Sequence, residues 1–499
     1  MPDEHLPTPS PSRGTDNMSS TTTEETIDFR REISLTTKLF YGFGAVANGV
    51  KSNAFNYFML FFYSQVVGLE GALVGLAMLV IMIADAISDP VIGHISDNWQ
   101  SRWGRRHPFM YFSAIPVSIC FFLIFIPPTD MSQGMTITYF LVVAIALRTF
   151  ITMFEIPSSS LVPEFTADYD QRTSILAFRY FFGWWGGVTI AILAYKIFFA
   201  SSDEFLDGRL NPDSWFNYGL FGACVIFVSI VVASVGTHNQ IPFLIKPKME
   251  KHAFNFKRVL GEMFESLSNR NFLVVFCSAL VAAMAAGVNM SLLLYFTTYF
   301  WGFSSTEIGT LNLVYYFSAL SALVLAPRLT AKRDKHRVAI FTYSFAILLL
   351  PLPVVLRLIG LFPGNDSEWL LPIMMLHGYI DVTGVIIAQI LISSMIADIV
   401  EDSQKSTGRR SEGLFFAGQS FATKVVNGFG VFATGIILSV INFPRDAAPD
   451  EVPQAILNNM AYIYVPVVVV FYMIAIYILT KYKITRSSHQ DNLQAVVEN

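Results

Sequence analysis

Apolar segments long enough to cross a lipid bilayer recur along almost the whole chain. A transmembrane helix needs roughly 20 mostly apolar residues. Segments near that length fall at 39–65, 72–97, 108–127, 135–162, 174–200, 216–238, 272–300, 306–327, 338–362, 368–399, 413–441 and 456–480. Only 14% of the 499 residues are charged, whereas a soluble domain has about 25%. The sequence therefore predicts an all-α integral membrane protein with about twelve transmembrane helices.

One connection between these segments is longer than the others and divides the chain into two halves. It runs from Thr237 to Asn271, and its basic residues are Lys246, Lys248, Lys251, Lys257 and Arg258. We predict a polar, disordered tail over 1–37, a six-helix bundle over 38–238, a central loop over 239–271, a second six-helix bundle over 272–482 and a tail over 483–499. Two six-helix halves are typical of the major facilitator fold.

The connecting loops differ in charge on the two sides of the predicted membrane. Besides the central loop, one side holds Arg102, Arg105, Arg106, Arg328, Lys332, Arg333, Lys335, Arg337, Lys405, Arg409, Arg410, Lys481, Lys483 and Arg486. The other side has Arg209 and Arg445. Because basic loops stay in the cytoplasm, we expect a multi-pass protein of the cell membrane, such as a bacterial inner membrane, with both termini and the central loop cytoplasmic.

The remaining composition limits the partners of the chain. A net charge of −4 gives no indication of nucleic-acid binding. The three cysteines, Cys120, Cys224 and Cys277, fall inside apolar segments and are typical of buried thiols and not of a disulfide framework. We expect a monomer embedded in the lipid bilayer.

Two aspartates, Asp85 and Asp89, stand in the apolar stretch "IMIADAISDP". A carboxylate in hydrocarbon costs at least about 2.5 kcal/mol, and residues four apart share one face of a helix, where like charges repel. In the fourth segment, Thr152 and Glu155 also share a face. Carboxylate and hydroxyl oxygens suit a hard cation, so we predict a site for Na⁺ or H⁺ on these side chains. The alternative is that each aspartate merely pairs with an arginine such as Arg148.

Other charged residues within the predicted spans have different interpretations. Lys196 and Arg357 lie near outer ends, where long side chains reach the interface. Asp381 either lines a cavity or meets a polar neighbour such as His377. At the end of the second segment, Asp97 is expected to pair with Arg105 or Arg106 and to brace one helix against the next.

Several stretches resemble a known family, the glycoside-pentoside-hexuronide:cation symporters. They include "KLFYGFGAVANG", "ADAISDPVIGHISD", "SRWGRRHPF", "EIPSSSLVP", "MIADIVED" and "EGLFFAGQSFATKVVNGFG", and they extend over roughly 38–440. The resemblance implies the major facilitator fold and roles for particular residues. It assigns cation binding to Asp85, Asp89 and Thr152, contact with both cation and sugar to Glu155, a place near the cation to Lys424, and a sugar contact to Arg179.

The chain also departs from that family. Gly49 and Ser159 replace an aspartate and a tryptophan that hold the sugar in galactoside-carrying members, and Asn48 replaces a lysine. We therefore expect a different glycoside, and we expect Gly49 and Ser159 to free volume in the cavity. Polar residues that could line the solute site are Asn48, Tyr57, Glu155, Arg179, Gln389 and Gln419.

These observations predict a secondary active transporter that couples a cation, Na⁺ or H⁺, to a sugar or glycoside by alternating access. A carrier of lipids, lysolipids or other organic solutes on the same fold is an alternative, and a non-transporting receptor is another. The sequence has no nucleophile motif or phosphate-binding loop at a plausible place, so we expect neither an enzyme nor a cofactor beyond the coupling ion.

Overall fold

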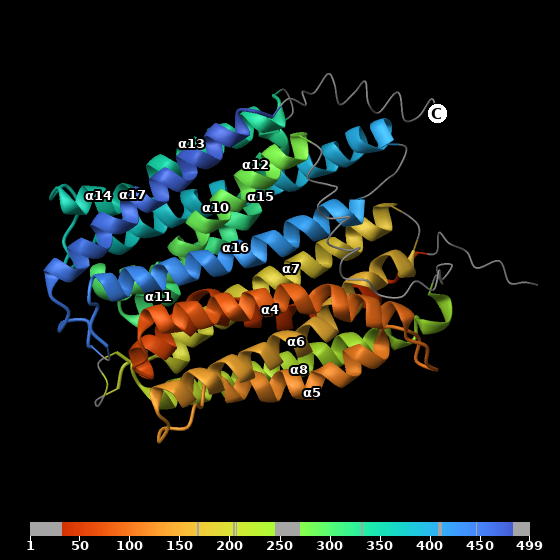
Figure 1. The fold of residues 1–499 in the computed structure, drawn as a ribbon, viewed down its shortest axis with the longest axis horizontal. Helices are drawn as coiled ribbons and strands as arrows, with labels where there is room; N and C mark the ends of the chain where they lie inside the picture. The colour runs from red at the N-terminus through yellow and green to blue at the C-terminus, as the bar shows by residue number, and fades with distance from the viewer. Residues whose placement is uncertain are drawn as a thin grey trace, which may run out of the picture.

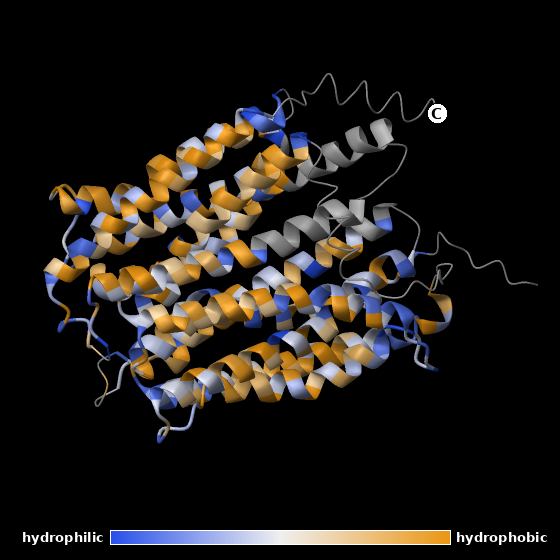
Figure 2. Ribbon diagram, viewed as in Figure 1, coloured by the Kyte–Doolittle hydropathy of each residue, from blue (hydrophilic) through white to orange (hydrophobic). Residues whose placement is uncertain are grey.

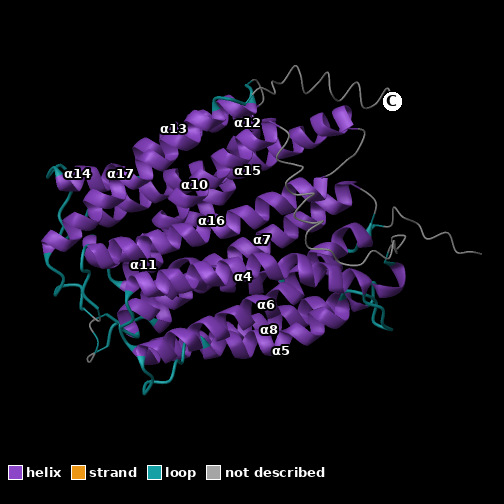
Figure 3. Ribbon diagram, viewed as in Figure 1, coloured by secondary structure: helices purple, strands orange, loops and turns teal. Residues whose placement is uncertain are grey.

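The computed structural model describes residues 32–166, 169–202, 205, 207–244, 270–330, 333–407, 412–445 and 447–482. Within these residues the regular secondary structure is entirely helical (Figure 3). Three predicted regions lie wholly or partly outside the described residues: 1–31 of the tail over 1–37, 245–269 of the central loop over 239–271, and the whole tail over 483–499.

The first half of the chain begins with a helix that is locally unwound. Its parts are α1 (Leu35–Phe43), α2 (Ala45–Asn53), the π-helical turn η1 (Ala54–Phe58), α3 (Met59–Phe61) and a second π-helical turn, η2 (Phe62–Val66). The longer helices that follow are α4 (Gly71–Asn98), α5 (His107–Leu123), α6 (Gln133–Phe165), α7 (Tyr169–Leu193) extended by η3 (Ala194–Phe198), and α8 (Pro212–His238). A short 3₁₀ turn, η4 (Ile241–Phe243), follows α8.

The second half repeats the pattern of long helices with short breaks. It comprises α10 (Arg270–Tyr295) with η5 (Phe296–Phe300), α11 (Ser305–Asn312), α12 (Val314–Thr330), α13 (Lys335–Leu349), α14 (Leu352–Leu358), α15 (Leu370–Thr407), α16 (Glu412–Val440) and α17 (Gln454–Leu479). Local sequence sets several starts. Ser304 caps α11 in a reciprocal pair with Glu307, and Asn211 caps α8 just before Pro212.

The expected membrane fold is confirmed at the level of its class. Nine helical stretches among the described residues have the length and hydropathy to cross a bilayer. Apolar residues cover the flanks of the helices, and the most polar residues gather toward their ends (Figure 2). The count of twelve spans and the domain boundaries stay predictions.

The helices lie roughly parallel in two groups (Figure 1). One group contains α4, α5, α6 and α8, and the other contains α10, α12, α13, α15 and α17. α4 and α16 pack tightly against each other where the groups meet, and α16 also packs on α10. Since α4 carries Asp85 and Asp89, this contact places the predicted cation site at the boundary between the halves.

Candidate cation and solute site

Two helices of the first half and one of the second supply the charged residues that the sequence analysis singled out. α4 carries Asp85 and Asp89 one turn apart, and α6 carries Arg148, Thr152 and Glu155. α16 contributes Lys424 from the other half. Both α4 and α6 contain a proline close to these residues, Pro90 and Pro157, which frees a backbone carbonyl inside the helix.

The two aspartates are held by side chains from both halves. Arg148 Nη1 lies 3.1 Å from Asp85 Oδ2. Lys424 Nζ lies 2.9 Å from Asp85 Oδ2 and 2.5 Å from Asp89 Oδ2. The Thr152 hydroxyl donates to Asp89 Oδ1 at 3.1 Å and lies 3.4 Å from Asp85 Oδ1. The repulsion expected between the aspartates is therefore offset by two cationic side chains.

The geometry contains elements of both interpretations that the sequence left open. Thr152 bridges the two carboxylates, as the cation site requires, and Arg148 pairs with Asp85, as the alternative requires. Among the residues that the structure describes, no group of three or more His, Cys, Asp and Glu side chains is arranged to hold a metal ion. The ammonium of Lys424 lies between the carboxylates, so Na⁺ binding at Asp85, Asp89, Thr152 and Glu155 stays a prediction.

Lys51 is a buried charge that the sequence analysis missed. It lies on α2, is 5% exposed, and places its Nζ 3.2 and 3.4 Å from the two carboxylate oxygens of Glu155. The signal was available, because Lys51 stands in the middle of the first apolar segment. With Lys51, three cations (Lys51, Arg148, Lys424) face three carboxylates (Asp85, Asp89, Glu155), and the cluster is formally neutral.

Arg179 on α7 lies beside this cluster and is held by groups of the first half. It donates to the hydroxyls of Tyr41 at 2.9 Å and Ser158 at 3.2 Å. It also reaches the backbone carbonyl of Glu155 at 3.4 Å. The structure thus brings Arg179 to the backbone of a predicted site residue, and its contact with a sugar stays a prediction.

The other predicted solute-binding residues are less closely grouped. Asn48 is half-buried and accepts a hydrogen bond from Ser52 at 3.1 Å. Tyr57 is half-buried and Gln389 is exposed. The side chain of Gln419 lies outside the described part of the chain.

The expectation that Gly49 frees volume in the cavity is wrong. A Cβ atom at Gly49 would lie 2.3 Å from the backbone oxygen of Gly183 and 2.7 Å from the backbone nitrogen of Gly187. Gly49 therefore faces α7 and permits close contact between helices. Ser159 is exposed, and its hydroxyl bonds back to the carbonyl of Ile156 at 2.9 Å.

The loop after α4 contains the ion pair that the sequence suggested. Asp97 pairs with Arg106, which also donates to Ser96 Oγ at 2.8 Å. Glu164, near the end of α6, accepts from Arg105 at 2.7 Å and from Arg106 at 3.0 Å. Glu164 was missed because nothing in its local sequence indicates that α6 ends beside this loop. The contacts tie α4, its loop and α6 together, and their role as a conformational brace stays a prediction.

Comparison with known proteins agrees with this picture. The family described as MFS/sugar transport protein matches residues 40–486. The chain is 25% identical to the putative glycoside/cation symporter YagG of Escherichia coli (strain K12), over 92% of this chain and 95% of that protein. It is 26% identical to the isoprimeverose transporter of Lactiplantibacillus pentosus, over 82% of this chain and 81% of that protein.

A solved structure supports the fold independently. The xylose transporter XylE from E. coli superposes with a TM-score of 0.60 at 13% identity, covering 92% of this chain and 98% of that one. So distant a likeness shows the fold alone. Together these matches confirm the resemblance to the glycoside-pentoside-hexuronide:cation symporters and the expected major facilitator fold.

Proposed function

The chain belongs to the MFS/sugar transport protein family, and we propose on that basis that it is a secondary active transporter that moves a sugar or glycoside together with Na⁺ or H⁺. The family consists of transporters, which confirms the expectation that the chain is not an enzyme. The observation that carries the proposed coupling to a cation is the contact of Lys424, on α16, with Asp85 and Asp89, on α4.

That contact offers a physical route to coupling. Lys424 belongs to the second half of the chain and the aspartates to the first, so the ion pair links the two halves. A free cation that binds Asp85, Asp89 and Thr152 competes with Lys424 and weakens this link. Coupling requires that a ligand bind one conformation more tightly than the other, and this competition provides that difference. The halves then rock about the site, which opens to each side in turn.

The solute is proposed to bind beside the cation, next to Glu155. Relatives described as a glycoside/cation symporter and an isoprimeverose transporter support a sugar or glycoside. Glu155, Arg179, Asn48, Tyr57, Gln389 and Gln419 remain the candidate contacts. Because Lys51 already pairs with Glu155, a solute that bonds to this carboxylate has to share or displace the Lys51 ammonium.

Uptake by reconstituted protein tests the proposal. Vesicles holding the purified chain are screened with radiolabelled isoprimeverose, lactose and other glycosides under an imposed Na⁺ gradient and, separately, a proton gradient. We expect one gradient to drive accumulation of at least one sugar. Asp89→Asn should reduce accumulation to the level of empty vesicles, whereas Asp130→Asn, the same change at an exposed loop, should not. Failure of every sugar alongside binding of a lysolipid would replace the proposal with the lipid-carrier alternative.

We further propose that the protein lies in the cell membrane as a monomer, with both termini in the cytoplasm. The asymmetry of lysine and arginine between the loops supports this orientation. Asp130, in the loop between α5 and α6, then faces outward. A single cysteine placed at Asp130 should react with a membrane-impermeant maleimide in intact cells, and labelling restricted to broken cells would reverse the orientation.

A further inference from the structure

Asp381 is an intramembrane carboxyl group outside the charged cluster. It lies on α15, eleven residues after the helix begins at Leu370, which corresponds to roughly 16 Å along the helix axis. The residue is half-buried, and its Oδ1 atom is fully buried without a hydrogen-bond partner. A buried carboxylate without a donor or a counter-charge is costly in a membrane, so this atom needs a physical explanation.

The sequence suggested His377 as a partner, and the structure places that ring elsewhere. His377, one turn before Asp381 on α15, bonds through Nε2 to the carbonyl oxygen of Leu349 at 2.8 Å. No described hydrogen bond or ion pair joins His377 to Asp381.

The phenol groups that interact electrostatically with Asp381 belong to helices of its own half. They are those of Tyr315 on α12 and of Tyr464 and Tyr472 on α17. The Tyr464 hydroxyl donates to Asn289 of α10 at 2.7 Å. On α13, the ring of Tyr343 lies 5.9 Å from that of Tyr472.

On the helices that pack around α15, the described charged side chains either lie at the ends of those helices or already have another partner. Lys424 on α16 pairs with Asp85 and Asp89, and Glu307 on α11 caps its own helix. Those at helix ends are Arg270 of α10, Arg328 of α12 and Lys335, His336 and Arg337 of α13. No described cation is therefore available to stabilise an ionised Asp381.

We propose that Asp381 is a proton-binding site within the second half of the molecule, separate from the carboxylates of the central cluster. The group binds one proton as a neutral carboxylic acid and releases it as a carboxylate. The neutral acid avoids placing negative charge on the buried Oδ1 atom, which has no hydrogen-bond donor. Release of the proton requires a rearrangement that brings a donor, such as the hydroxyl of Tyr315 or Tyr472, to the carboxylate. Proton release and a change in helix packing are thereby linked.

This inference gives the proposed transport a proton site of its own, and it is tested without any solute. Infrared spectra of the purified full-length protein in an alkyl maltoside detergent, which has no carbonyl group, are recorded from acidic to alkaline pH. A neutral carboxylic acid has a carbonyl stretch that an ionised carboxylate lacks. We expect this band at neutral pH in the parent protein and its loss in Asp381→Asn. Asp381→Glu should restore a band at a shifted frequency.

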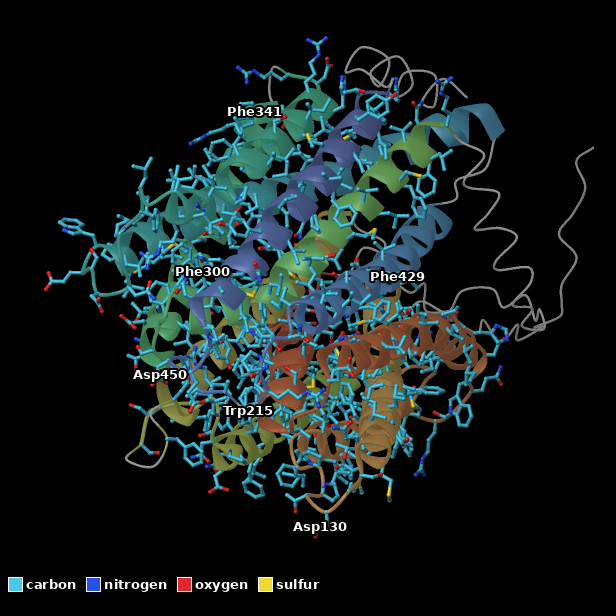
Figure 4. The ribbon with its side chains drawn as sticks, turned by 60° about the vertical axis from the view of Figure 1, so that its left-hand side comes forward. Asp130, Trp215, Phe300, Phe341, Phe429 and Asp450 are labelled. Atoms are coloured by element: carbon cyan, nitrogen blue, oxygen red, sulfur yellow. The ribbon has the colours of Figure 1, made fainter. Side chains whose placement is uncertain are left out.

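Asp130→Asn is the matched control, because Asp130 lies at the tip of an exposed loop (Figure 4). It should leave the band unchanged. Absence of the band from the parent protein at neutral pH, or its persistence in a folded Asp381→Asn protein, would overturn the inference. Because the spectra involve no transport, the outcome is independent of whether the sugar screen succeeds.

Discussion

At the scale of single residues, the central cluster is organised by pairing. Three cations and three carboxylates from α2, α4, α6 and α16 meet inside the membrane region. Removing one partner of a buried ion pair leaves an uncompensated charge, whereas removing both is often close to neutral. Comparing single with double variants therefore shows which charged residues mainly neutralise a neighbouring charge.

The pair of Lys51 with Glu155 is the clearest case of two buried charges that neutralise each other. Lys51→Met alone, or Glu155→Gln alone, should lower the unfolding free energy by about 3–5 kcal/mol. The double variant should recover most of that loss, because no unpaired charge remains. Thermal unfolding of the purified variants measures this cycle. Lys38→Met, which loses a bond to the neutral hydroxyl of Ser174, is the control, and a double variant as unstable as the sum of the single ones would contradict the assignment.

Substitution of Lys424 tests whether its ammonium group competes with a free cation for Asp85 and Asp89. Lys424→Ala removes the ammonium that lies between Asp85 and Asp89. If a free cation replaces it, the half-saturating cation concentration for binding should fall roughly tenfold, which corresponds to ~1.4 kcal/mol. Cation titration of the purified protein by calorimetry gives this value. Lys424→Arg keeps the charge and should stay near the parent protein, and unchanged affinity in Lys424→Ala would argue against competition.

At the scale of helices, close packing explains Gly49, which the sequence analysis expected to free volume in the cavity. Gly49 of α2 meets Gly183 and Gly187 of α7, which are spaced four apart. Small residues with this spacing let two helices approach within backbone contact. The glycine that stands in place of a sugar-binding aspartate is thus a packing residue in this chain.

The close contact of α2 with α7 predicts that adding one methyl group at Gly49 lowers the stability of the protein. Gly49→Ala brings its Cβ against backbone atoms, which cannot move without shifting a helix. Overpacking of this kind should cost about 1–3 kcal/mol, visible as a lower thermal unfolding temperature. Gly134→Ala, at a position where a Cβ meets nothing within 4 Å, should have little effect. Equal stability of the two variants would show that α2 and α7 are not held so closely.

At the scale of the whole molecule, the halves also meet near the predicted outer end. The backbone nitrogen of Ala72, on α4, donates to Ser439 Oγ, on α16, at 3.2 Å, and Ser64 lies 2.5 Å from the hydroxyl of Tyr295. Arg209 is 1% exposed and donates across the boundary to Thr298 at 2.8 Å. If transport requires the halves to separate at this end, a covalent link here should stop it.

A pair of cysteines at Ala72 and Ser439 provides that link. The hydrogen bond between Ala72 and Ser439 makes these residues neighbours across α4 and α16, and a disulfide joins residues whose Cα atoms lie about 4.4–6.8 Å apart. In a background where Cys120, Cys224 and Cys277, which are free thiols, are replaced by serine, oxidation should reduce sugar exchange to the level of empty vesicles, and a reductant should restore it. Each single-cysteine variant should be insensitive to oxidant. Full transport by the cross-linked protein would contradict movement at this contact.

The sequence by itself determined the membrane class, the approximate positions of the apolar helices and which of the candidate site residues share a helix. These features follow from short-range rules, since apolar length defines a span and helical periodicity puts Asp85 with Asp89 and Thr152 with Glu155. Tertiary structure alone decided which residues meet across helices. Lys424 and Asp89 are 335 residues apart, and Lys51 and Glu155 are 104 apart. Such contacts depend on the face that each helix turns to its neighbours, and packing of the whole bundle sets that face.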